Sequence, residues 1–211
     1  MVARPGSFAV LVPVKSPGTG KSRLAALPDA DRRRLAAAFA VDAVAACTAV
    51  PLVGLVVVVS DDAEFAASLA GPGVVPTGDP GAGLNAALRH GAAVAHAARP
   101  DLRPVALLAD LPALTSADLG AALGEVGPGA AFVADAEGTG TTLYTAPYGA
   151  FEPRFGPGSA AAHGASGAVA LDGAWASLRR DVDDLDDLDA ARALGLGPAT
   201  TAALTAVRPP H

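Results

Sequence analysis

The sequence Ser7–Arg23, SFAVLVPVKSPGTGKSR, joins an apolar run to a loop rich in glycine and cationic side chains. The run Phe8–Val14 is typical of a buried strand. In α/β proteins a loop of this kind holds phosphate groups, because backbone N–H groups line the anion and cationic side chains balance its charge. The stretch therefore predicts an α/β domain whose first strand delivers a phosphate-binding loop. The candidate phosphate-binding residues are Lys15, Gly18, Gly20, Lys21 and Arg23.

The same loop also resembles part of a P-loop. The segment Gly20-Lys21-Ser22 matches the end of the motif G-x-x-x-x-G-K-[ST], whose first glycine would fall at position 15. That position is Lys15, whose Cβ and long side chain occupy space that the P-loop turn leaves to bare backbone. A P-loop NTPase or kinase stays the alternative interpretation, because Leu107–Asp110 (LLAD) resembles a Walker B strand.

Composition favours a packed globular chain. It has 211 residues, of which 51% are hydrophobic and 17% charged, enough for one α/β domain or a tight pair of small ones. We expect a single domain over residues 1–211. The net charge of −6 argues against a nucleic-acid polymer as ligand. The single cysteine, Cys47, excludes a disulfide within the chain and favours a reducing cytoplasm. No apolar run approaches the roughly 20 residues that span a bilayer, so no membrane partner is expected.

Strand patterns alternate with helical patterns along the chain. Strands are expected at 8–14, 52–59, 73–75, 104–108, 131–134 and 143–146. Helices are expected at 28–48, 63–69, from Leu84, from Ser116, after Ser159 and, as the last one, at 185–194. This alternation predicts a three-layer sandwich with a mostly parallel central sheet. Ligands bind such sheets beyond the carboxyl ends of the strands. The residues expected there include Lys15, Lys21, Asp61, Asp110, Asp135 and the loop 138–142.

Aspartates near these strand ends are candidate metal ligands. Asp110 follows an apolar strand, and a carboxylate there suits a hard cation such as Mg²⁺; the alternative is that it caps a turn. Asp181 and Asp183 flank Val182, and in an extended segment residues i and i+2 point the same way. Such carboxylates repel each other unless a cation or arginines lie between them. The alternative interpretation of this second segment is a solvated acidic loop.

Two further loops are candidate anion sites. The segment Gly138–Thr142 offers bare backbone and hydroxyl groups that suit phosphate or carboxylate oxygens; the alternative is a plain hairpin connection. The segment Gly156–Ser159 enters a helix, and helix N-termini favour anions; the alternative is that Ser159 is a simple N-cap. His163, a few residues on, is interpreted as a helix-surface residue.

Six segments, taken in order, carry a combined signal that is specific. They are LVPVKSPGTGKSRLA from Leu11, GLNAAL from Gly83, ADLPAL from Ala109, FVADAEGTGTTLYTA from Phe132, FGPGSAAAH from Phe155 and LRRDVD from Leu178. With them the chain resembles one family, the guanylyltransferases that make the guanosine-diphospho intermediate of the deazaflavin coenzyme F(420). The resemblance covers nearly the whole chain and implies a Rossmann-like nucleotidyltransferase (glycosyltransferase-A-like) fold. It further implies transfer of GMP from GTP to phosphoenolpyruvate, with 2-phospho-L-lactate as the acceptor in relatives.

The resemblance also implies roles for individual residues. The opening loop would hold the GTP phosphates, with Lys15, Lys21 and Arg23 as the catalytic cations and Gly18 and Gly20 as backbone contacts. Asn85 would lie by the guanine base or ribose. Mg²⁺ would be held by Asp110, Asp181 and Asp183, and phosphoenolpyruvate by Thr141, Gly156 and Ser159. The product is unstable in relatives, so handover to the next pathway enzyme is a further expectation. A non-catalytic nucleotide-binding module remains a third interpretation.

Overall fold

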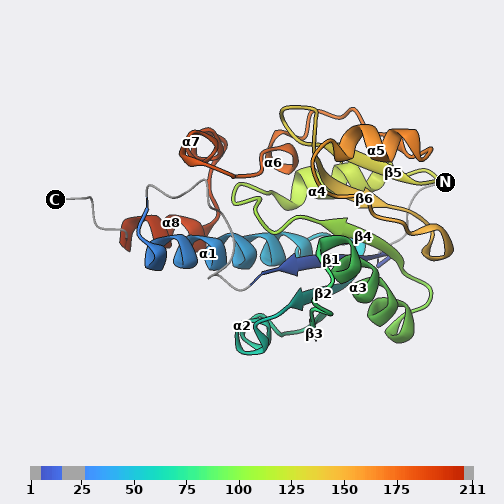
Figure 1. Ribbon diagram of the computed structural model, residues 1–211, viewed down its shortest axis with the longest axis horizontal. Coiled ribbons are helices and arrows are strands. Elements are labelled where there is room, and N and C mark those ends of the chain that lie inside the picture. The colour runs from blue at the N-terminus through green and yellow to red at the C-terminus, as the bar shows by residue number, and fades with distance from the viewer. Residues whose placement is uncertain (1–5, 16–26, 207–211) are drawn as a thin grey trace.

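The computed structural model describes residues 6–15 and 27–206, which contain a seven-stranded sheet with helices on both faces (Figure 1). The order of strands is β3-β2-β1-β4-β6-β5-β7. Neighbouring strands are parallel except that β6 runs antiparallel to both β4 and β5. The predicted mostly parallel sheet is therefore confirmed. The strands are β1 (Phe8–Val14), β2 (Val53–Ser60), β3 (Val74–Gly78), β4 (Arg103–Leu107), β5 (Ala131–Ala134), β6 (Thr141–Thr145) and β7 (Val169–Ala170).

The predicted helix starts are confirmed at three sites. Pro28 directly precedes α1, the Thr115 hydroxyl accepts a hydrogen bond from the Asp118 N–H at the start of α4, and Asp184 forms a capping box with Asp187 in α7. The helices are α1 (Asp29–Thr48), α2 (Ala63–Ser68), α3 (Leu84–Ala98), α4 (Ser116–Gly124), α5 (Ser159–Ala165), α6 (Ala176–Arg179), α7 (Leu185–Leu194) and α8 (Pro198–Ala206).

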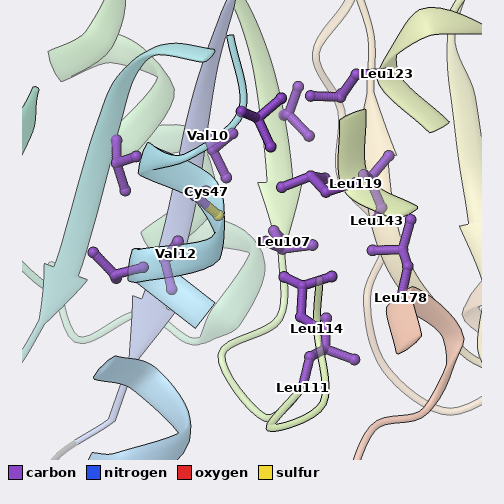
Figure 2. Close-up of a cluster of buried hydrophobic side chains, with 14 of the residues drawn as sticks. Val10, Val12, Cys47, Leu107, Leu111, Leu114, Leu119, Leu123, Leu143 and Leu178 are labelled. Carbon is purple, nitrogen blue, oxygen red and sulfur yellow. The ribbon is translucent and has the colours of Figure 1, made fainter. Parts of the chain in front are cut away.

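Alternate side chains of β1 enter different hydrophobic cores, which makes the fold a three-layer sandwich. Val10 and Val12 pack in a cluster with residues of α1, α4 and α6, whereas Ala9 and Leu11 pack in a cluster with residues of α3 and α5. Figure 2 shows part of the first cluster, where Cys47 of α1 lies among valines of β1 and leucines of other elements. Burying one valine or leucine side chain completely stabilises the folded state by about 1.5–3 kcal/mol relative to leaving it exposed.

The sequence predicted the helix at 185–194, which is α7, as the last one, and this prediction is wrong. Helix α8 follows and lies beside α1 (Figure 1). A third hydrophobic cluster joins α1, α7 and α8, and it includes Phe39, Val182 and Leu188. The buried carboxylate of Asp42 in α1 accepts hydrogen bonds from the first turn of α8, from Ala199 N at 3.0 Å and Thr200 N at 2.8 Å. Asp42 therefore caps a helix that is distant in sequence.

The order of the strands contains a topological switch point beside β1. The chain runs from β1 outward to β2 and β3, and then returns through α3 to β4 on the other side of β1. In open α/β sheets ligands bind where the connections diverge in this way, which in this chain is at the carboxyl ends of β1 and β4. Because β6 is antiparallel, its first residue, Thr141, lies at this same edge of the sheet. The topology thus brings Lys15, the loop after β4 and the start of β6 to the carboxyl edge of the sheet.

The Asp42 cap predicts a specific loss of stability. Asp42→Ala leaves two N–H groups of α8 without their acceptor, and we expect the free energy of unfolding to fall by about 2 kcal/mol. Asp42→Asn keeps one acceptor oxygen and should lose less. Asp29→Ala, an exposed position on the same helix, should change stability by about 0.5 kcal/mol or less. Urea unfolding measures all three, and equal losses for Asp42→Ala and Asp29→Ala would contradict the capping role.

Candidate nucleotidyltransferase site

The carboxyl edge of the sheet carries Lys15 and Asp110 on either side of the switch point. Lys15 follows the last residue of β1 and its side chain is exposed. Asp110 is half-buried in the loop after β4, which ends at Leu107 rather than at Leu108 as predicted. The remaining predicted residues of the opening loop lie outside the described residues; they are Gly18, Gly20, Lys21 and Arg23.

The segment from Asp181 to Asp183 lies directly against the Asp110 loop. The Val182 N–H donates a hydrogen bond to the Asp110 carbonyl at 3.0 Å. The Val182 side chain is fully buried, whereas Asp181 is half-buried and Asp183 is exposed on either side of it. This main-chain contact places the segment that carries Asp181 and Asp183 beside the loop that carries Asp110. Their role as metal ligands stays a prediction.

Asp181 is both half-buried and surrounded by other carboxylates at this edge. Burial, and then the carboxylates of Asp110, Asp183 and Asp135, raise the pKa of the Asp181 carboxyl to about 7. Carboxylate oxygens of Asp135, Glu137 and Asp181 also lie within 4.8 Å of one another. A divalent cation would relieve this repulsion, and a donor set made of oxygens suits a hard cation.

Sequence reasoning placed Asp135 at this edge but missed Glu137, and it gave neither a place in the acidic cluster. The Asp135 carboxylate accepts hydrogen bonds from Thr139 N at 2.9 Å and Gly140 N at 2.7 Å, so it also shapes the hairpin turn. Glu137 forms an ion pair with Arg180 at 2.8 Å. The available signal was their position immediately after β5, at the same sheet edge as Asp110.

The segment 138–142 does lie between two antiparallel strands, as the plainer interpretation of a hairpin connection held. The expected strand 143–146 is wrong at its start, because β6 already begins at Thr141. Thr141, however, is buried and its Oγ1 lies 3.0 Å from Nδ1 of His163. The expectation that His163 is a helix-surface residue is wrong, because its side chain is fully buried against the ring of Tyr144. Helix α5 is short and rich in alanine, and spacing alone did not show which of its faces meets the sheet.

The segment Gly156–Ser159 is held in place from α3. The Asn85 side-chain amide donates to the Phe155 carbonyl at 2.9 Å and accepts from the Phe155 N–H at 2.8 Å. Gly158 is the N-cap of α5 with a φ of 72°, a conformation that favours glycine. Ser159 is therefore the first helical residue and buried, so the interpretation of Ser159 as a simple N-cap is wrong. In the structure Asn85 positions this loop.

Solved structures share this architecture. A protein from Desulfovibrio desulfuricans G20 described as a nucleotide-diphospho-sugar transferase has a TM-score of 0.70 and 21% identity, with 95% of this chain and 94% of that chain covered. The 4-diphosphocytidyl-2C-methyl-D-erythritol synthase of Anaerococcus prevotii has a TM-score of 0.57 and 9% identity, over 89% of this chain and 96% of that chain. The fold is thus that of the nucleotide-diphospho-sugar transferase class, to which such nucleotidyltransferases belong.

Sequence comparison narrows the class. Residues 8–168 match the family described as guanylyl transferase CofC like, and the chain belongs to this family. A protein of Salinispora arenicola named phosphoenolpyruvate guanylyltransferase is 52% identical over 95% of this chain and 97% of its own length. A protein of Thermomonospora curvata with the same name is 50% identical over 93% of this chain and 88% of its own length. Among the residues that the structure describes, none of the helices has the length and apolar character to cross a membrane.

The raised pKa of Asp181 predicts how stability depends on pH. Unfolding returns this carboxyl to a pKa near 3.8, so the folded protein binds the extra proton between that value and about 7. Raising the pH through this window therefore destabilises the fold, and the cost is complete above pH 7. With a metal chelator present, Asp181→Asn should raise the melting temperature at pH 8 by about 2–4 °C or more, and little at pH 4.

The matched control for this experiment is Asp186→Asn, an exposed position on the same acidic segment. It should leave the pH dependence of melting as it is in the parent protein. If the melting temperatures of Asp181→Asn and of the parent protein changed with pH in the same way between pH 4 and pH 8, the raised pKa of Asp181 would be contradicted.

Proposed function

We propose that residues 1–211 form one nucleotidyltransferase domain that transfers GMP from GTP to phosphoenolpyruvate, releasing pyrophosphate and giving enolpyruvyl-diphospho-guanosine. The observation that carries the proposal is the convergence of Asp110, Asp181 and Asp183 at the switch point of a guanylyl transferase fold. The names of relatives about 50% identical over nearly the whole chain favour phosphoenolpyruvate as acceptor. The alternative acceptor is 2-phospho-L-lactate.

The acidic edge fits a resident Mg²⁺ ion. Burial, and then the neighbouring carboxylates, oppose the ionisation of Asp181, and a bound cation would offset this opposition. We assign Asp110, Asp181 and Asp183 as ligands, because their segments meet through the Val182 main chain. Bound Mg²⁺ would neutralise phosphate charge and make the α-phosphorus of GTP more electrophilic.

The opening loop is proposed to hold the GTP phosphates. Lys15 stands at the end of β1 with an exposed side chain, where its ammonium group can balance the charge of the triphosphate. Lys21 and Arg23 are assigned the same electrostatic role, with the backbone of Gly18 and Gly20 as N–H donors. The Asn85 amide already makes two hydrogen bonds to the main chain of Phe155. A contact of Asn85 with the base or ribose can therefore use only the remaining hydrogen-bonding capacity of this amide.

The acceptor is proposed to bind at the same edge of the sheet, at Thr141, Gly156 and Ser159. These residues offer hydroxyl and N–H donors without a full charge, which suits an anion held close to carboxylates. The helix N-terminus at Ser159 adds a favourable partial charge. Phosphoenolpyruvate is thereby oriented with its phosphate toward the GTP side.

The chemical step then needs alignment more than proton transfer. A phosphate oxygen of phosphoenolpyruvate forms a bond to the α-phosphorus, while the bond from that phosphorus to the bridging oxygen of the β-phosphate breaks. The electron pair of the broken bond leaves with pyrophosphate. Since the attacking phosphate is already ionised at pH 7, no protein nucleophile or strong base is required. A cytoplasmic location and direct handover of the product to the next enzyme belong to the same proposal.

The reaction is tested by incubating the protein with GTP, Mg²⁺ and either phosphoenolpyruvate or 2-phospho-L-lactate, with pyrophosphate as the readout. We expect pyrophosphate with phosphoenolpyruvate as the better acceptor. Release of inorganic phosphate from the γ-position would instead favour the P-loop alternative. GTP binding without release of either product, with the product-consuming enzyme also supplied, would favour a non-catalytic binding module.

The metal assignment predicts a large effect of one neutral substitution. Asp183→Asn should lower kcat/KM for pyrophosphate release by about 10²-fold or more, because a ligand to the cation that stabilises the transition state is lost. Raising the Mg²⁺ concentration should restore part of the rate. Asp186→Asn, on the exposed start of α7, should keep the parent rate. Unchanged activity of Asp183→Asn would remove this residue from the site.

A further inference from the structure

His163 in α5 is a fully buried imidazole with a hydrogen-bond partner at each ring nitrogen. Its Nδ1 lies 3.0 Å from Oγ1 of Thr141, and its Nε2 accepts a hydrogen bond from the Arg154 N–H at 2.9 Å. The ring stacks on Tyr144 at a centroid distance of 4.5 Å and meets Phe155 edge to face at 5.5 Å. Its orientation is therefore fixed on both sides.

The partner at Nε2 determines where the imidazole carries its proton. A backbone N–H can only donate, so Nε2 must offer its lone pair to Arg154. A neutral imidazole then has its one N–H at Nδ1, and this group donates to the Thr141 hydroxyl. Burial, followed by the nearby charge of Arg154, lowers the pKa of His163 to about 4, so the ring is neutral at pH 7.

The proton on Nδ1 of His163 limits the directions in which the hydrogen of the Thr141 hydroxyl can point. This group has one hydrogen and two acceptor lone pairs, and the His163 N–H occupies one of the lone pairs. The hydroxyl hydrogen therefore cannot point back to His163. Among residues 6–15 and 27–206, His163 provides the only hydrogen bond recorded at Thr141 Oγ1, although Thr141 is buried.

We propose that His163 is a positioning residue that keeps the Thr141 hydroxyl as a hydrogen-bond donor toward an oxyanion of the acceptor acid. This inference rests on the proposed function, in which Thr141 binds that acid. Arg154 N–H, His163 and Thr141 form a chain of hydrogen bonds that all donate in one direction. With the opposite tautomer, Thr141 would donate to His163 and present a lone pair to the anion, which would repel it.

Two substitutions of His163 test its hydrogen bonds to Thr141 and to Arg154 separately. In His163→Asn the side-chain amide nitrogen takes the place of Nδ1 and can still donate to Thr141. In His163→Gln the amide oxygen takes the place of Nε2, so it still accepts from Arg154 but the donor to Thr141 is lost. We expect His163→Gln to raise the KM for phosphoenolpyruvate about 10-fold or more, the effect of weakening one hydrogen bond to a charged group.

The KM for GTP should change by about twofold or less in His163→Gln, and His163→Asn should recover most of the affinity for phosphoenolpyruvate. Thr141→Val removes the hydroxyl itself, and adding His163→Gln to it should raise the KM little further, since both act on one interaction. Equal losses for both substrates, or an unchanged KM for phosphoenolpyruvate in an active His163→Gln variant, would overturn the inference while leaving the guanylyl transfer intact.

A second measurement does not depend on activity or on a substituted protein. Nitrogen-15 NMR of the parent protein distinguishes the two imidazole tautomers, and the His163 signals should show the Nδ1–H form at pH 7. A proton on Nε2, or an imidazolium, would overturn the inference even if the variants fail to fold. Absence of pyrophosphate release with any phospho-acid would count against the proposed function instead.

Discussion

The hydrogen bond from the Val182 N–H to the Asp110 carbonyl joins the two segments that carry the candidate metal ligands. It brings a segment near the end of the chain against the loop after β4, and the buried Val182 side chain anchors that segment in the cluster formed with α1 and α7. Burial of the Asp181 carboxyl, and then repulsion from the carboxylates around it, act against this arrangement, as the raised pKa of Asp181 indicates. Apolar packing therefore holds together charges that would otherwise separate.

The two parts of the proposed site differ in their chemistry. Aspartates gather around the loop after β4, whereas the donors proposed for the acceptor acid are neutral: the Thr141 hydroxyl and the N-terminal turn of α5. A free cationic side chain beside the aspartates would pair with them, as Arg180 does with Glu137. Neutral donors can hold an anion near the carboxylates without this competition. The reversed direction of β6 brings Thr141 to the edge where the parallel strands end.

Much of the fold could be predicted from the sequence, because its signals are local. The apolar runs of β1 and β2, and the caps of α4 and α7, depend on neighbouring residues alone. The adjacency of Asp110 to Asp181 and Asp183 was accessible only through the family resemblance, since spacing left the acidic segment as consistent with a solvated loop. Helix α8 was missed because its N-terminus is capped by Asp42, a residue far away in the chain.

Other features could not be predicted because they are set by tertiary contacts. The burial of His163 depends on which face of α5 meets Tyr144, and a short alanine-rich helix does not encode that choice in its spacing. The bidentate contact of Asn85 with Phe155 likewise joins a helix and a loop that come together only in the folded chain. In both cases the polar residue was visible in the sequence and its partner was not.

The most direct test of the central claim is a crystal structure of the protein with phosphoenolpyruvate, Mg²⁺ and a non-hydrolysable GTP analogue. We expect Mg²⁺ to be coordinated by oxygens of Asp110, Asp181 and Asp183, with the acceptor bound at Thr141 and the α-phosphate beside it. A cation held elsewhere, or an acceptor bound away from this edge of the sheet, would contradict the claim.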